Sequence, residues 1–312
     1  LARLFLLILL FNLFNPKIWF LSCTAIVQNI INISLAYISF KYLIPSVKFS
    51  IKNYRILKAK ELLSAGMYNS LILVGTTLIS QISILVANRY LDADIVGIYS
   101  SMVLLPTLIQ QIGSSISSAF SPSTLAIYSS GKINQLNAYS NKVVMICAYL
   151  LGWPISVITA MGVPIFHLWL KIDYSSHKMI FAVLMLYLVS SLAFSQLNVV
   201  NQAFNKLRLP AYFSIIVGVY NFFLSILLVT KYNMGLWGIV IANVSAFFIR
   251  NIIFVPIYTS KITNQPWYIY FKGIIKPQIL SIVIYFIGVI AEGRYLINNF
   301  FTLFIMCILL SI

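Results

Sequence analysis

A single arginine, Arg250, interrupts a long and largely apolar stretch, which continues through residues 237–248 before it and 252–258 after it. A cation inside a helix that crosses a lipid bilayer faces a cavity or a partner, and the same stretch holds no Asp or Glu. Asn243, seven residues earlier, lies on the same helical face. Two interpretations of Arg250 stay open. Its guanidinium binds an anionic group such as a diphosphate, to which it can offer planar, paired donors, or it extends to lipid headgroups about two turns away.

Polar side chains recur at helical spacing on other apolar stretches, where they form stripes along one helical face. A single Ser or Thr in such a stripe is commonly a packing contact between membrane helices. Four polar-faced stretches in one chain instead favour a hydrated cavity suited to sugars or other polar cargo. The stripes comprise Gln110, Ser114, Ser117 and Ser121; Ser191, Ser195, Asn198, Gln202 and Asn205; Asn69, Thr76, Ser80 and Ser83 with Gln81 beside them; and Gln28 with Asn32. We predict that the substrate-binding residues are Arg250, Asn243, Gln110, Ser114, Ser117, Asn69, Gln81, Gln28, Asn198 and Gln202.

The composition indicates which solvent surrounds these elements. The chain is 61% hydrophobic and only 8% charged, whereas a soluble domain carries about a quarter charged residues. Most of its surface therefore faces lipid, where backbone groups are paired in helices or closed barrels, and continuous apolar runs favour helices. We predict an all-α polytopic membrane protein, which excludes soluble enzyme folds. Most of the apolar runs are about 20 residues or longer, and they begin near Ile18, Leu62, Ile95, Val143, Met179, Pro210, Leu236, Ile274 and Ile297.

The net charge of +16 is explained by membrane topology rather than by a basic stripe for nucleic acid, and no nucleic-acid partner is expected. If residues 41–61 are cytoplasmic and each span reverses direction, 13 of the 21 Lys and Arg residues fall in inside loops. The opposite loops hold six basic residues and four of the five acids. An excess of Lys and Arg on the cytoplasmic side is the known orientation signal, so the alternation supports this direction.

The domain organisation follows from the polar intervals. We predict that residues 1–40 are the end of a first transmembrane lobe, that 41–61 form a basic cytoplasmic loop between lobes, and that 62–312 form a second lobe with C-terminal spans. Residues 122–141, which contain Gly131 and several Ser and Asn, are expected to form a second inside loop. The first and last apolar stretches are short, so a fragment of a longer protein is expected. The three cysteines have no metal-site spacing, so neither zinc nor a disulfide is expected.

Short motifs occur in a specific order along nearly the whole chain. They are LLSAG (62–66) after the basic loop, ANRYL (87–91), VGIYS (96–100), AFSP (119–122), NQAFNK (201–206) and GLWGIVIA (235–242). In order and spacing they resemble the polysaccharide-transport branch of the multidrug/oligosaccharidyl-lipid/polysaccharide exporter superfamily, especially Wzx-type O-antigen flippases.

The resemblance implies a MATE-like helical bundle of about twelve to fourteen helices in two lobes, with alternating access to a cavity between them. The chain would supply mainly the second lobe and the end of the first. The implied cargo is an oligosaccharide on undecaprenyl diphosphate, moved across the bacterial cytoplasmic membrane without covalent chemistry, metal or cofactor. Membrane lipids and a polysaccharide polymerase assembly are the other partners considered.

Three alternatives stay open at this point. One is a structural membrane subunit, whose polar stripes would be buried against a partner. A drug exporter of the same superfamily would carry acidic cation sites. A membrane glycosyltransferase or O-antigen polymerase would need a large polar loop with catalytic acids or arginines, and none of the predicted loops is large.

Overall fold

The computed structural model describes residues 2–13, 19–43, 56–171 and 174–294, and all its regular elements there are helical. The chain divides into two compact units, Leu1–Lys60 and Glu61–Ile312. In the first unit α1 (Ala2–Leu13) packs against α2 (Trp19–Leu43). Ring contacts between Phe11 and Phe20 join these two helices.

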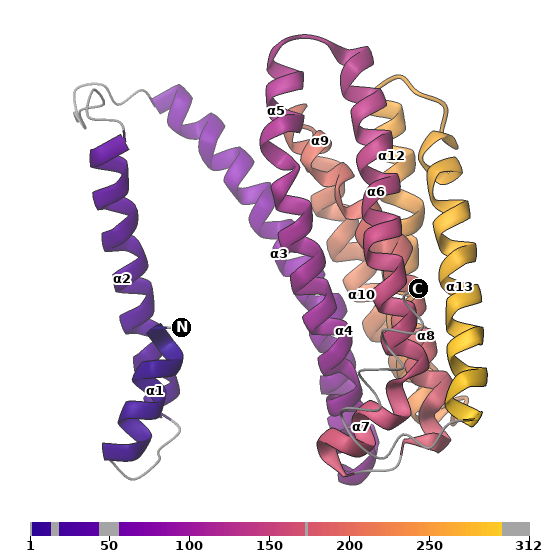
Figure 1. Ribbon diagram of the computed structural model, residues 1–312. Coiled ribbons are helices and arrows are strands. Elements are labelled where there is room, and N and C mark those ends of the chain that lie inside the picture. Colours follow the sequence, from indigo (N-terminus) through magenta and orange to yellow (C-terminus); the bar gives the residue numbers. More distant parts are fainter. Residues whose placement is uncertain (1, 14–18, 44–55, 172–173, 295–312) are drawn as a thin grey trace. The chain divides into compact units, whose positions relative to one another are not determined.

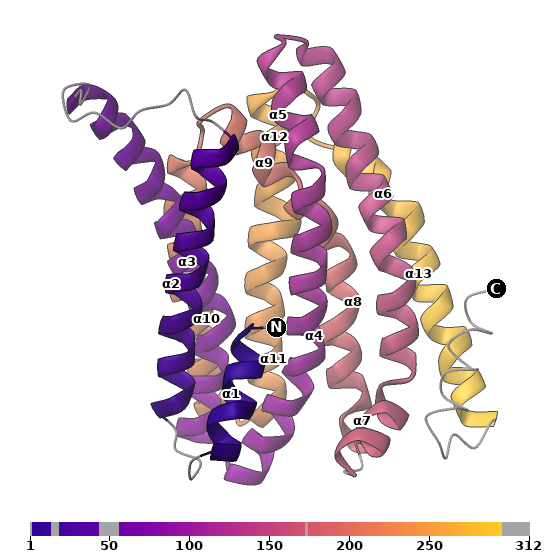
Figure 2. The same ribbon diagram turned by 60° about the vertical axis from the view of Figure 1, so that its left-hand side comes forward.

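The second unit is a bundle of long helices that lie side by side with alternating directions (Figures 1 and 2). Short helices continue several of them at the two ends of the bundle. The elements are α3 (Ile56–Tyr90), whose first turn precedes the unit boundary, α4 (Ala93–Ala119), α5 (Ser121–Ser129), α6 (Ile133–Ala160), α7 (Gly162–Leu170), η2 (Ser175–His177), α8 (Lys178–Ser195), α9 (Leu197–Ala203), α10 (Arg208–Thr230), α11 (Gly235–Phe247), η3 (Phe248–Phe254), α12 (Val255–Ile262) and α13 (Ile269–Arg294).

Eight helical segments of the described chain are long and apolar enough to cross a membrane. They are Ser22–Leu43, Gly66–Tyr90, Ala93–Ser129, Ile133–Ala160, Ser175–Ala203, Arg208–Thr230, Gly235–Ile262 and Ile269–Glu292. They correspond in order to the first eight predicted runs, and the ninth, from Ile297, lies outside the described residues. The prediction of an all-α polytopic membrane protein is confirmed.

The predicted inside loop at residues 122–141 is wrong. Only Ser130, Gly131 and Lys132 separate α5 from α6, so most of the interval is helical. Pro122 lies in the first turn of α5, where its missing N–H costs no helical hydrogen bond. Packing of α5 against α6 and α9 stabilises this polar sequence as helix.

The basic interval at residues 41–61 is also shorter than expected. Lys41 lies in the last turn of α2, and α3 already begins at Ile56. The intervening residues 44–55 lie outside the described part of the chain. The boundary between the two compact units falls at Lys60, near the end of the predicted loop.

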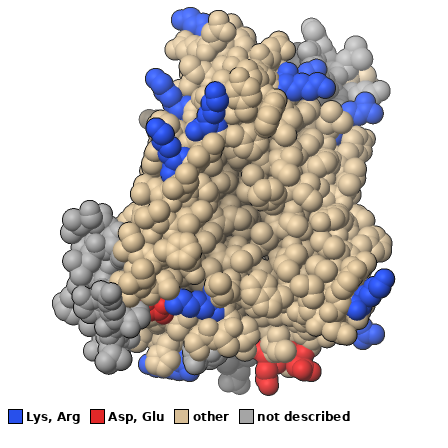
Figure 3. Space-filling model, turned by 90° about the vertical axis from the view of Figure 1, so that its right-hand side faces the viewer, with Lys and Arg blue, Asp and Glu red and all other residues tan. Residues whose placement is uncertain are grey.

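Charged side chains gather at the two ends of the second unit, as the face in Figure 3 shows. The turns α5–α6, α9–α10 and α12–α13 meet at one end, and the turns α3–α4 and α10–α11 lie at the other. The first end carries Lys132, Lys206, Arg208, Lys261 and Lys272, and the second carries Arg89, Lys171, Lys178 and Lys231 together with Asp92, Asp94 and Glu292. At the second end Lys178 pairs with Glu292 and links α8 to α13.

Helix α8 lies at the centre of the second unit and contacts α4, α6, α11 and α13. Residues on nearly every face of it are buried, which explains why its apolar side chains are spread all round the helix. The polar positions on α8 are therefore enclosed by protein rather than exposed to lipid. This places its Ser stripe among the neighbouring helices.

Candidate functional site

Arg250 lies on a widened helical turn. Segment η3 is a π-helix between α11 and α12, and the Val255 N–H donates to the carbonyl of Arg250, five residues earlier. Pro256 follows directly. It lacks an N–H, and its ring would clash with the carbonyl of residue 252 in a regular α-helix, which accounts for the widening. Single π-helical turns are frequent at functional sites because they shift side chains out of the regular helical register.

Hydrogen bonds hold the helices on both sides of this turn. On the α11 side, Asn243 Nδ2 donates to the Ile79 carbonyl of α3 at 2.9 Å. On the α12 side, Thr259 Oγ1 donates to Asn201 Oδ1 of α9 at 3.0 Å. The widened turn therefore lies between two fixed helical segments, and its register determines where Arg250 points.

Replacing Pro256 with alanine restores the missing N–H and removes the clash. We expect a regular α-helix to form and Arg250 to rotate away from Ser214, which a structure of the variant would show. The melting temperature should not fall. Pro266→Ala, in the turn before α13, is the matched control. A widened turn that persists in Pro256→Ala would show that Pro256 does not cause it.

The Arg250 side chain is 7% exposed and is held by neutral groups. Its Nε donates to Ser214 Oγ of α10 at 2.8 Å, and its Nη1 donates to Asn251 Oδ1 at 2.6 Å. Asn251 Nδ2 in turn donates to Ser191 Oγ of α8 at 2.7 Å. In the part of the chain that the structure describes, no carboxylate pairs with Arg250. A guanidinium has five N–H donors, so three remain for a ligand.

Arg250 lines a cavity of about 340 Å³, which we call the cationic pocket. Helices α3, α4, α8 and the α11–η3 segment each contribute to its wall. Most of the lining residues carry a hydroxyl or an amide group, and Arg250 is the charged residue of the lining. The lining residues are Thr76, Thr77, Ser80, Gln110, Ser114, Ser191, Leu192, Ser195, Phe247, Arg250 and Asn251.

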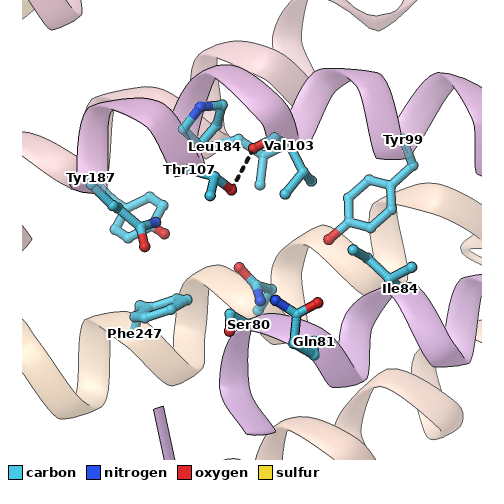
Figure 4. A pocket seen from close by; sticks show the side chains of 12 residues that line it. Ser80, Gln81, Ile84, Tyr99, Val103, Thr107, Leu184, Tyr187 and Phe247 are labelled. Atoms are coloured by element: carbon cyan, nitrogen blue, oxygen red, sulfur yellow. Dashed lines mark hydrogen bonds between the residues drawn. The ribbon is translucent and has the colours of Figure 1, made fainter. Parts of the chain in front are cut away.

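A second cavity of about 140 Å³ adjoins the first, and we call it the neutral pocket (Figure 4). Ser80, Gln110 and Phe247 line both cavities. In Figure 4 the side chains of Gln81 and Tyr187 extend into the space between the helices. Its other lining residues are Ile84, Tyr99, Val103, Pro106, Thr107, Leu184 and Asn243.

Five of the predicted binding residues line these cavities. Arg250 and Ser114 line the cationic pocket, Gln81 and Asn243 line the neutral pocket, and Gln110 lines both. Because all four helices of the lining belong to the second unit, both pockets lie within that unit.

The other five predicted residues do not line either pocket. Ser117 is buried and bonded to Ser195 Oγ at 3.2 Å, and Asn198 donates to the Ser195 carbonyl at 3.0 Å. Asn69 of α3 and Gln202 of α9 are exposed. Gln28 belongs to α2 of the first unit. Ser117 thus links α4 to α8, which is the packing role common for small polar residues in membrane helices.

Aromatic residues of the lining did not stand out in the sequence. The rings of Tyr187 and Phe247 have centroids 5.9 Å apart at an angle of 28°. In a chain with 15% aromatic residues they look like ordinary lipid-facing positions. Asn251 was also missed, and its position directly after Arg250 is the signal that would have indicated it.

Two asparagine side chains share one backbone acceptor beside the neutral pocket. Asn221 Nδ2 of α10 and Asn243 Nδ2 of α11 each donate to the Ile79 carbonyl at 2.9 Å. Both also reach Ser83 Oγ, at 3.4 and 3.0 Å respectively. This network joins three helices at the base of the site.

Replacing Asn221 with leucine should lower stability while leaving the pockets intact. Two interhelical hydrogen bonds are lost at about 0.6 kcal/mol each, the typical value inside membranes, so we expect a loss of about 1 kcal/mol. Thermal unfolding of the purified protein measures the effect. Thr230→Val, on the same helix, removes only a bond to the Ile226 carbonyl within α10 and is the control. Equal stability of the two variants would contradict a role for Asn221 in joining the helices.

Comparison with known proteins gives one relative of the chain. It is 33% identical over 277 residues to the uncharacterized membrane protein EpsK of Bacillus subtilis (strain 168). The match covers 89% of this chain and 55% of EpsK, so the chain spans about half the length of this curated relative. No family model and no solved structure matches the chain. The similarity and the eight spans agree on a multi-pass membrane protein.

Proposed function

We propose that the protein carrying this chain is a flippase for oligosaccharides linked to undecaprenyl diphosphate, working by alternating access in the bacterial cytoplasmic membrane. The observation that supports this most is the Arg250 site. A buried guanidinium with free donors faces a pocket of hydroxyls and amides within a membrane helix bundle. Such a pocket suits an anion joined to a polar, uncharged group, as in a sugar diphosphate.

The alternative functions fit the site less well. A drug exporter that takes cations needs an acid in its binding cavity, and neither pocket is lined by Asp or Glu. A glycosyltransferase or polymerase needs a large polar loop with catalytic groups. In the second unit most turns between described helices contain only a few residues.

The charge distribution supports the orientation. The end of the second unit that carries Lys132, Lys206, Arg208, Lys261 and Lys272 faces the cytoplasm in this proposal. The Arg250 site then lies between the two leaflets, open in turn to each side. Membrane lipids and a polysaccharide polymerase would be its partners.

Complementation tests the proposal. The full-length gene is expressed in a strain that lacks its O-antigen flippase, and surface polymer is scored together with the membrane level of the protein. Restored polymer is the expected result. Absence of polymer at a normal protein level, in several strains with different repeat units, would contradict the proposal.

A further inference from the structure

We infer that the two pockets form an ordered binding site, in which the cationic pocket holds the diphosphate and the neutral pocket holds the uncharged sugar ring attached to it. The inference rests on the proposed function and specifies the substrate class of that site. It is carried by the order, size and chemistry of the pockets.

On each of four helices, the residues of the cationic pocket lie nearer the basic end of the unit than the residues of the neutral pocket. On α3, which runs away from the basic end of the unit, Thr76 of the cationic pocket precedes Gln81 of the neutral pocket. On α8, which runs toward that end, Tyr187 of the neutral pocket precedes Ser191 of the cationic pocket.

The remaining two helices also run toward the basic end and show the same order. On α4, Tyr99 and Val103 of the neutral pocket precede Ser114 of the cationic pocket. On α11 and η3, Asn243 precedes Arg250. The cationic pocket therefore lies nearer the basic end of the bundle, and the neutral pocket lies farther from it. A lipid-linked sugar that enters from the basic side would place its sugar ahead of its diphosphate.

The volume of the neutral pocket suits one ring. Its 140 Å³ is close to the volume of an engineered protein cavity of about 150 Å³ that accepts benzene. A substituted pyranose is larger than benzene, so the neutral pocket has room for the body of no more than one sugar ring, with its substituents reaching toward the adjoining cationic pocket. The larger cationic pocket, at about 340 Å³, has room for the diphosphate and its hydration.

The lining of the neutral pocket suits a sugar without charge. It contains no Lys, Arg, Asp or Glu. The stacked rings of Tyr187 and Phe247 offer an apolar surface for the C–H face of a pyranose. The Gln81 and Gln110 side chains make no hydrogen bond with any described residue in the structure, so their amides are available for sugar hydroxyls. A uronic acid would bury its carboxylate here without a cation, which is costly.

The two pockets are adjacent, which identifies the ring. Ser80, Gln110 and Phe247 line both of them, so a group in the neutral pocket lies next to a group in the cationic pocket. The first sugar and the first isoprene unit of the lipid are both bonded directly to the diphosphate that Arg250 would hold. The hydroxyl and amide groups of Ser80, Gln81 and Gln110 in the neutral pocket favour the sugar.

Binding measurements on the full-length protein in lipid nanodiscs test the inference with three probes. They are undecaprenyl diphosphate, the same lipid carrying N-acetylglucosamine, and the same lipid carrying glucuronic acid. We expect the N-acetylglucosamine probe to bind about tenfold more tightly than undecaprenyl diphosphate, as a few neutral hydrogen bonds would give. The glucuronic acid probe should show no such gain.

Gln81→Leu provides the variant arm, with Gln111→Leu on α4 as the matched control because Gln111 is exposed and lines neither pocket. Gln81→Leu should reduce the gain from N-acetylglucosamine by at least half, and Gln111→Leu should keep it. If Gln81→Leu does not fold, the affinity order of the wild-type protein for the three probes decides alone.

The possible failures are distinct. If no probe binds, the proposed function and the inference both fall. If all three probes bind equally, or Gln81→Leu matches the control, the assignment of the neutral pocket to a sugar is refuted while the flippase proposal stands. Tighter binding of the glucuronic acid probe would refute the preference for an uncharged sugar.

Discussion

Replacing Arg250 with glutamine should reduce transport by the full-length protein about thirtyfold, because it removes charge-assisted hydrogen bonds worth about 2 kcal/mol. Glutamine keeps a polar amide of intermediate length, so the loss reports mainly the positive charge. Arg250→Lys should be intermediate, since an ammonium keeps the charge but cannot offer the planar pair of donors. Flipping of a fluorescent undecaprenyl-diphosphate sugar in proteoliposomes gives the rates.

The control for this prediction removes a cation elsewhere. Lys272 is exposed near the start of α13, contacts the ring of Tyr268 and lines neither pocket. Lys272→Gln should transport at close to the wild-type rate. If Arg250→Gln transports as fast as Lys272→Gln at equal protein level, Arg250 does not contact the cargo.

Replacing Gly75 with valine should damage both stability and transport. A Cβ at Gly75 would lie 2.6 Å from the Cβ and the carbonyl carbon of Ser214, closer than real Cβ atoms approach. Helices α3 and α10 would have to separate, at a cost of about 1–3 kcal/mol for overpacking. Ser214 would move with α10, and its bond to Arg250 Nε would be lost. We expect a lower melting temperature and transport reduced at least as much as in a Ser214→Ala variant.

Gly66 provides the matched control on the same helix. No heavy atom lies within 4 Å of a Cβ built at Gly66, so Gly66→Val adds the same side chain without a clash. Both variants carry the same small change in helix propensity. Equal melting temperatures would show that the close approach of Gly75 to Ser214 does not limit stability.

Several features of the protein follow from its sequence alone. The positions of eight spans could be predicted because apolar length is set by bilayer thickness, and lipid leaves helices as the way to pair the backbone. Because each span reverses the direction of the chain, the alternation of charge between the two ends of the bundle could also be predicted once the spans were placed. Arg250 stood out because a cation is rare inside a membrane span. In each case the property depends on neighbours along the chain.

Other features required the tertiary structure. The polar stripe of α3 contains Asn69, Thr76 and Ser80 on one face. Thr76 and Ser80 reach a pocket and Asn69 does not, because the neighbouring helices enclose the middle of α3 and not its start. Asn251 lines the same cavity as Arg250, although it belongs to none of the predicted polar stripes. Ser117 looked the same as Ser114 in sequence and proved to be a helix contact. The partner helix decides whether a polar group faces a cavity or another side chain, and helix pairing is a long-range property that local pattern does not contain.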